Sequence, residues 1–174
     1  DASVDIVVSV FGVEYSDLDR SLAEIERVLK PGGRLLALLH HGESMVTSMS
    51  RRAVSEYVED DVDAVIGSLR TISKARDNTP DLSQLKNNAE AEKARATINE
   101  LAGKYLGNTD PDTANATMFE LMSNALKFFK MMRQDSSTRS AFGDALTEEH
   151  RASRDRCEQM VSGAWDDCRV RERE

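Results

Sequence analysis

Two short apolar runs near the N-terminus constrain the fold of this chain more than any other feature. Residues 4–10 read VDIVVSV and residues 35–39 read LLALL. Such nearly continuous aliphatic runs are typical of strands that are buried on both faces, as in parallel sheets. Between them, apolar residues recur at helical spacing, after a Ser-Asp helix start and before a Lys-Pro-Gly-Gly stop at residues 30–33. The order strand, helix, strand predicts one βαβ unit with parallel strands.

The rest of the chain has the periodicity of helices. Apolar positions predict helical patterns over residues 46–72, 82–106 and 118–132, and the last of these should be the most buried. Residues 134–144 are predicted to form a polar loop. Thr147 should then cap a further helix that reaches Trp165.

These patterns predict an α/β fold with three segments. Residues 1–43 would form a partial Rossmann-like core of two parallel strands with a crossover helix, and residues 44–145 a helical insertion or cap. Residues 146–174 would supply a helix and, near Arg169 to Arg171, the start of a possible further strand.

Two strands that are apolar on both faces need neighbours, because parallel sheets occur almost only where several strands are covered by helices. We therefore expect further strands before residue 1 and after residue 174. The alternative is a small α+β domain that completes its sheet by dimerising.

Composition excludes several classes of partner. The formal net charge of −8 argues against nucleic acid, because phosphate binding needs a basic surface. No apolar run approaches the roughly 20 residues that span a bilayer. Cys157 and Cys168 are too few for a disulfide framework and do not form a CxxC pair, so a cytoplasmic location is expected.

The first 40 residues resemble class I S-adenosylmethionine-dependent methyltransferases. The resemblance rests on VDIVVS at residues 4–9 and on LAEIERVLKPGGRL at residues 22–35, in that order. It implies two successive strands of the family's sheet, with S-adenosylmethionine as cofactor and methyl transfer to a small-molecule acceptor. The family's glycine-rich cofactor loop and ribose-binding acid have no counterpart here. The chain therefore resembles the C-terminal part of such an enzyme, and it should be inactive alone.

Ligands of open α/β sheets bind at the carboxyl ends of the strands, which selects two loops as the candidate site. Ser9, Val10 and Phe11 end the first strand, and the resemblance places them beside the cofactor. Gly12, Glu14 and Tyr15 follow and would face the acceptor. The alternative is structural: Phe11 packs in the core, Tyr15 is a half-buried anchor and Glu14 is a solvated charge.

His40 and His41 follow the second strand and are the candidate catalytic residues. A histidine there can accept a proton from a hydroxyl or amine as the methyl group arrives. No metal site is predicted, because adjacent strand residues point to opposite faces and do not readily share one ion. The alternative is that one ring is hydrogen-bonded in the core while the other is exposed.

Two other functions remain open at this point. Strand-helix-strand units also occur in nicotinamide-dependent reductases, so the chain could be a fragment of one. It could also be a non-catalytic helical interaction module that binds a partner through its acidic surface.

Overall fold

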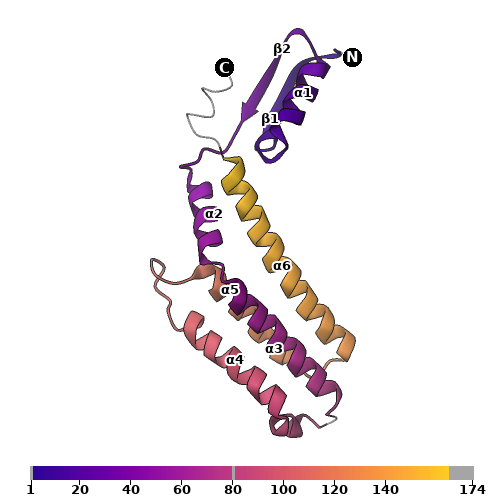
Figure 1. Ribbon diagram of the computed structural model, residues 1–174, viewed down its shortest axis with the longest axis vertical. Coiled ribbons are helices and arrows are strands. Elements are labelled where there is room, and N and C mark those ends of the chain that lie inside the picture. Colours follow the sequence, from indigo (N-terminus) through magenta and orange to yellow (C-terminus); the bar gives the residue numbers. More distant parts are fainter. Residues whose placement is uncertain (1, 80, 165–174) are drawn as a thin grey trace. The chain divides into compact units, whose positions relative to one another are not determined.

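The computed structural model describes residues 2–79 and 81–164, and they form two compact units (Figure 1). The first unit combines the chain up to Val54 with the chain from Asp155 onward, and the second comprises Ser55–Arg154. These boundaries do not coincide with the predicted segments 1–43, 44–145 and 146–174. The division instead cuts through two helices, α2 (Met45–Glu56) and α6 (Ser136–Gly163).

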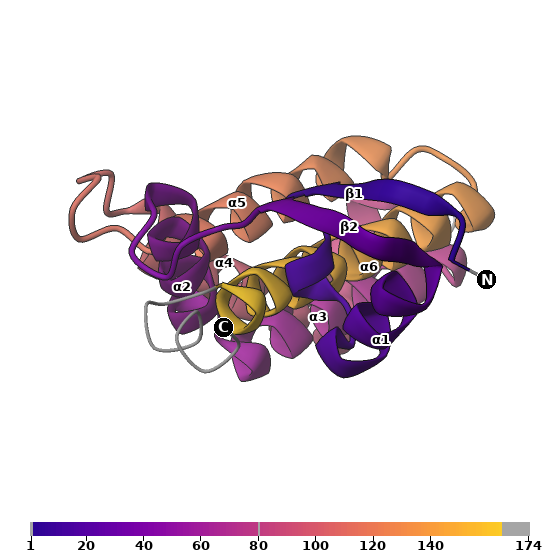
Figure 2. The ribbon, with the colours of Figure 1, turned by 90° about the horizontal axis from the view of Figure 1, so that it is seen from above.

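The first unit contains the predicted strand-helix-strand unit. Strands β1 (Val4–Val10) and β2 (Leu29–Leu38) form a two-stranded parallel sheet, and helix α1 (Leu18–Val28) connects them. Figure 2 shows the two strands side by side. The helix begins at Asp17, whose carboxylate accepts a hydrogen bond from the Arg20 backbone N–H at 3.2 Å. The fold class is that of a partial Rossmann-like α/β sheet followed by a mostly helical region.

The Lys-Pro-Gly-Gly segment corrects one expectation. It was expected to separate helix from strand, but the structure places it inside β2. Leu29 pairs with Val4, and Arg34 already pairs with Ile6, so the intervening residues of β2 bulge out of register. Gly32 has a φ of 81°, which favours glycine, and a Cβ on Gly33 would lie 2.9 Å from the carbonyl oxygen of Lys30.

The strands were expected to be buried on both faces, and this is wrong for the present chain. The exposed fractions of Ile6, Val8 and Val10 are 55%, 65% and 62%. Leu36 and Leu38, which pair with Val8 and Val10, are also exposed. Because side chains alternate along a strand, these five residues share one face, and no described element of this unit covers them. The expectation of further strands stays a prediction.

The sequence predicted one helical pattern over residues 46–72, but the structure forms two helices there. Helix α2 ends at Glu56, and α3 (Glu59–Asp77) begins after Val58, whose backbone is extended (φ −113°, ψ 95°). Glu59, Asp60 and Asp61 occupy the first turn of α3, where negative charge stabilises a helix N-terminus. The pattern over residues 82–106 becomes a short 3₁₀ helix, η2 (Leu82–Asn87), and α4 (Ala89–Leu106), which stops before Gly107 as predicted.

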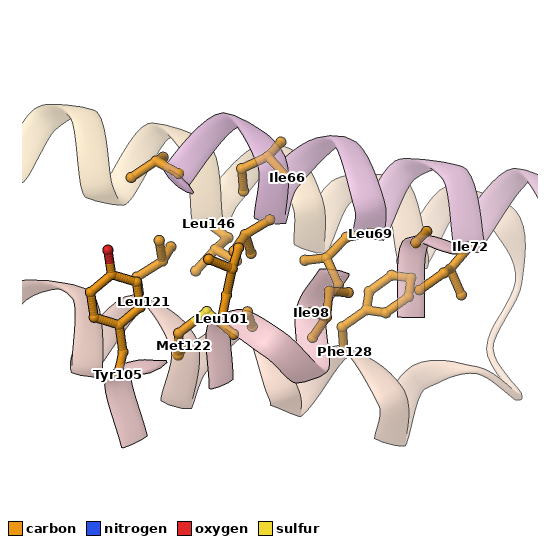
Figure 3. Packing of buried hydrophobic residues seen from close by; sticks show 14 of the residues in the cluster. Ile66, Leu69, Ile72, Ile98, Leu101, Tyr105, Leu121, Met122, Phe128 and Leu146 are labelled. Atoms are coloured by element: carbon orange, nitrogen blue, oxygen red, sulfur yellow. The ribbon is translucent and has the colours of Figure 1, made fainter. Parts of the chain in front are cut away.

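The second unit has its own apolar core. Helix α5 (Ala116–Ala125) and the 3₁₀ helix η3 (Leu126–Met131) contribute Met118, Leu121, Met122, Ala125 and Phe128, each at most 1% exposed. This confirms that residues 118–132 supply a central segment. In Figure 3, Leu121, Met122 and Phe128 lie among side chains of α3, α4 and α6: Ile66, Leu69, Ile72, Ile98, Leu101, Tyr105 and Leu146. No helix in the described parts of the chain is long and apolar enough to cross a membrane.

Helix α6 corrects the prediction of a polar loop at residues 134–144. The helix has 28 residues and begins at Ser136, because the Asp135 carboxylate accepts a hydrogen bond from the Thr138 backbone N–H at 2.8 Å. Thr147, the predicted cap, lies inside this helix and donates its hydroxyl to the Gly143 carbonyl oxygen at 2.8 Å. Trp165 and the predicted strand start near Arg169 lie outside the described residues.

The core of the second unit yields a stability prediction. Phe128→Ala should lower the free energy of unfolding by about 3–5 kcal/mol, because a fully buried aromatic ring is lost and a cavity is left. Phe119→Ala is the matched control, because Phe119 is 37% exposed and the same deletion should cost much less. Urea unfolding followed by circular dichroism measures both. Equal losses would contradict this description of the core.

His150 yields a prediction about pH. It is 7% exposed on α6, and burial lowers its pKa below 6.5 although Glu120 and Glu149 act in the opposite direction. As pH falls through 6.5, the unfolded chain takes up this proton before the folded chain does, so the free energy of unfolding should fall. The loss is complete below the pKa of the folded state.

His150→Gln isolates this contribution. Urea midpoints measured near neutral pH and at about pH 5.5 should fall less in the variant than in the parent chain. The other titrating groups are common to both proteins, so the difference between them reports His150. An identical pH dependence in the two proteins would remove His150 as a source of acid sensitivity.

Candidate functional site

The loop after β1 folds back onto the end of β2. The backbone N–H of Phe11 donates to the carbonyl oxygen of Leu38 at 2.8 Å, so pairing continues one residue beyond β1. A short 3₁₀ helix, η1 (Val13–Tyr15), follows, and the hydroxyl of Ser9 accepts a hydrogen bond from the Val13 backbone N–H at 3.0 Å. Ser9 therefore fixes the start of η1, and Gly12 is the residue that leads into it.

Phe11 has a backbone conformation that is unusual for its residue type. Its φ of 51° lies in the left-handed region, which costs a non-glycine residue on the order of 1 kcal/mol. The conformation is accompanied by a ring contact, because the centroids of Phe11 and His40 lie 4.2 Å apart with 32° between the ring planes. Phe11 remains 44% exposed, so it does not pack in a core.

His40 is the centre of a polar cluster. Its Nδ1 lies 2.6 Å from the Tyr15 hydroxyl and 3.3 Å from Oε1 of Glu14. Its backbone N–H also donates to Oε1 of Glu14, at 3.3 Å. The expected meeting of the loop after β1 with the end of β2 is thus confirmed, with Glu14, Tyr15 and His40 in contact.

Glu14 is not the solvated charge that the structural alternative expected. The residue is 3% exposed and its side chain is fully buried. One carboxylate oxygen contacts His40, whereas the other, Oε2, has no hydrogen-bond partner among the described residues. Such an arrangement is costly unless a positive charge or a donor faces the carboxylate. Its negative charge, together with burial, raises the pKa of the Tyr15 phenol, and burial is the larger cause.

A residue far along the chain completes the cluster. The Tyr15 hydroxyl donates to Sδ of Met160 at 2.8 Å, and Met160 lies in the last turn of α6. The end of α6 packs closely on η1, because a Cβ on Gly163 would lie 2.6 Å from the carbonyl oxygen of Glu14. Sequence reasoning missed Met160, and no local motif could have indicated it, since its partner is 145 residues away.

His41 occupies a different environment from His40. It is exposed, and its Nδ1 accepts a hydrogen bond from the Glu43 backbone N–H at 3.1 Å. Its carbonyl oxygen accepts from the Thr47 hydroxyl at 2.9 Å, close to the start of α2. The structure therefore brings His40, and not His41, into contact with Phe11, Glu14 and Tyr15.

The residues at this edge fit S-adenosylmethionine only in part. Exposed Val10 and Phe11 offer apolar surface at the end of β1, which suits the methionine part of the molecule. In the described chain, no glycine-rich loop runs from a strand into a helix to hold the rest of it, and Gly32 lies within β2, before its carboxyl end. No group of three or more His, Cys, Asp or Glu side chains that could hold a metal ion occurs among the described residues.

Residues 1–37 match the family model described as Methyltransferase domain. This N-terminal segment is therefore similar to part of a methyltransferase domain. The match covers β1, α1 and nearly all of β2, and it ends before His40. No curated protein and no solved structure matches the chain. The matched segment contains the two strands whose carboxyl ends carry the cluster.

The partial fit predicts that the 174-residue chain alone binds S-adenosylmethionine weakly or not at all. Val10 and Phe11 supply one apolar wall, but the described chain has no glycine-rich strand-to-helix loop whose backbone amides could bind the cofactor's charged groups. Calorimetric titration of the isolated chain measures this directly. A dissociation constant in the micromolar range, about −8 kcal/mol, would show that the chain carries a cofactor site of its own.

Proposed function

We propose that the chain acts within an S-adenosylmethionine-dependent methyltransferase that methylates a small-molecule acceptor, with His40 as the general base. Methyl transfer is what the match to a methyltransferase domain indicates. The observation that supports the role of His40 is its position at the carboxyl end of the sheet, in contact with Glu14, Tyr15 and Phe11. Ligands of open α/β sheets bind at that edge.

The cofactor would supply a methyl group on a sulfonium, whose sulfur keeps the bonding electron pair when the carbon leaves. The protein's own task is to position the acceptor, exclude water and take up the acceptor's proton. His40 suits the last step because its side chain is only partly exposed and its two polar side-chain contacts both involve Nδ1. Nε2 is then the ring nitrogen that meets the acceptor.

Phe11 and Val10 would form the apolar wall beside the methyl group, where they limit the access of water. Ser9 would act indirectly. Its hydroxyl accepts a hydrogen bond from the Val13 backbone N–H at the start of η1, and η1 carries Glu14 and Tyr15, which contact His40. Gly12 begins that turn. A Cβ there would meet Ser9 Oγ at 3.5 Å, an ordinary contact, so Gly12→Ala should be tolerated sterically.

The partners follow from composition. We propose a small-molecule acceptor rather than nucleic acid, since the net charge of −8 disfavours phosphate binding. We propose no membrane partner. A cytoplasmic location agrees with the two cysteines, which are too few for a disulfide framework.

His40→Ala tests the proposed base in the complete enzyme that contains this chain. Turnover should fall roughly 100-fold or more, the usual contribution of a general base, with little change in cofactor affinity. His41→Ala is the matched control and should leave turnover within a few-fold of the parent enzyme, because His41 lies outside the cluster. Unchanged turnover in His40→Ala would reduce His40 to a structural residue.

A further inference from the structure

The cluster around His40 also determines which of its ring nitrogens carries the hydrogen. A neutral imidazole has one N–H donor and one acceptor nitrogen, and the contacts of one nitrogen select the state of the other. Both polar side-chain contacts of the ring involve Nδ1: the Tyr15 hydroxyl at 2.6 Å and Oε1 of Glu14 at 3.3 Å. The described residues provide no hydrogen bond to Nε2.

Tyr15 has a single hydroxyl hydrogen and two neighbours that can accept it. One is Nδ1 of His40 and the other is Sδ of Met160, at 2.8 Å. A thioether sulfur has no hydrogen to donate, so the contact with Met160 is a hydrogen bond only when Tyr15 donates to it. The Tyr15 oxygen then accepts from Nδ1–H. The raised pKa of Tyr15 keeps the phenol protonated at neutral pH.

Glu14 favours the same arrangement. An ionised carboxylate only accepts hydrogen bonds, and Oε1 of Glu14 lies 3.3 Å from Nδ1. A lone pair on Nδ1 would face this oxygen and repel it, whereas an N–H is attracted to it. The fully buried side chain of Glu14 strengthens this preference, because electrostatic interactions are weakly screened away from water.

We propose that Glu14, Tyr15 and Met160 are positioning residues that hold His40 as its Nδ1–H tautomer and leave the Nε2 lone pair for the acceptor's proton. The inference rests on the proposed function only for the use of Nε2. The acceptor's proton passes to Nε2, and its electron pair stays on the acceptor atom for the bond to the methyl carbon. The imidazolium then returns the proton to solvent.

The buried carboxylate of Glu14 has a second role in this scheme. A buried carboxylate with an unsatisfied oxygen is unfavourable beside a neutral ring. When His40 becomes an imidazolium, the positive charge lies next to that carboxylate and the pair is mutually stabilised. Glu14 can thus hold the imidazolium that forms after the acceptor's proton passes to Nε2.

Nitrogen-15 NMR of the 174-residue chain tests the tautomer without any assay of activity. Protonated and unprotonated imidazole nitrogens have well-separated shifts, and the signals of His40 are assigned by their loss in His40→Ala. We expect the parent chain to show Nδ1 protonated and Nε2 unprotonated near neutral pH. A majority of the Nε2–H form would overturn the proposal.

Met160→Leu is the most informative variant, because it nearly conserves side-chain volume and removes only the sulfur that accepts the Tyr15 hydrogen bond. Without the sulfur, Tyr15 donates to Nδ1, and the Nε2–H population should rise several-fold. Glu14→Gln should raise it as well, since the acceptor-only carboxylate is gone. Met45→Leu is the matched control: Met45 is 77% exposed, and the tautomer should not change. Unchanged tautomers in both test variants would overturn the proposal.

Kinetics of the complete enzyme separate this inference from the proposed function. Met160→Leu and Glu14→Gln should lower kcat with little change in KM for the cofactor, whereas Met45→Leu should not. A correct tautomer together with normal turnover of His40→Ala would refute His40 as the base but leave the positioning role intact. The wrong tautomer together with inactive His40→Ala would refute the positioning role alone.

Discussion

The parallel pairing of β1 with β2 is the constraint on which the candidate site depends. Because the strands run in the same direction, both carboxyl ends emerge at one edge of the sheet. The hydrogen bond from Phe11 to Leu38 extends the pairing past the last residue of β1 and brings η1 next to the residues that follow β2. His40 therefore reaches Glu14 and Tyr15, although 25 residues separate it from Tyr15 in the chain.

The two compact units differ in how far they bury their apolar residues. The second unit buries residues from α3, α4, α5, η3 and α6 in one core, whose buried members all lie within Ser55–Arg154. The first unit exposes Ile6, Val8, Leu36 and their neighbours on one face of its sheet. Exposed apolar surface of this kind is unfavourable in water. The helical unit therefore covers its apolar residues with its own helices, whereas one apolar face of the sheet stays exposed in the described chain.

Local signals in the sequence correctly predicted the elements that depend on neighbouring residues. The Asp17 cap, the end of α4 at Gly107 and the apolar stripe of residues 118–132 were all visible in the sequence. Two errors also have local causes. The cap at Asp135 was overlooked, so the helix was predicted to start at Thr147 instead of Ser136. The glycines of residues 32–33 were interpreted as a turn before the strand, whereas they form a bulge inside β2.

The sequence by itself determined the strand-helix-strand order and, through it, which loops meet at the edge of the sheet. Hydrophobic periodicity and strand direction are properties of the chain, so Ser9 to Tyr15 and His40 were identifiable without coordinates. Only the tertiary structure decided that Glu14 is buried and that His40 rather than His41 contacts it. It also decided that Met160 accepts a hydrogen bond from the Tyr15 hydroxyl. Burial and hydrogen-bond partners depend on how α6 packs against η1. That contact joins residues 145 positions apart, which no local pattern encodes.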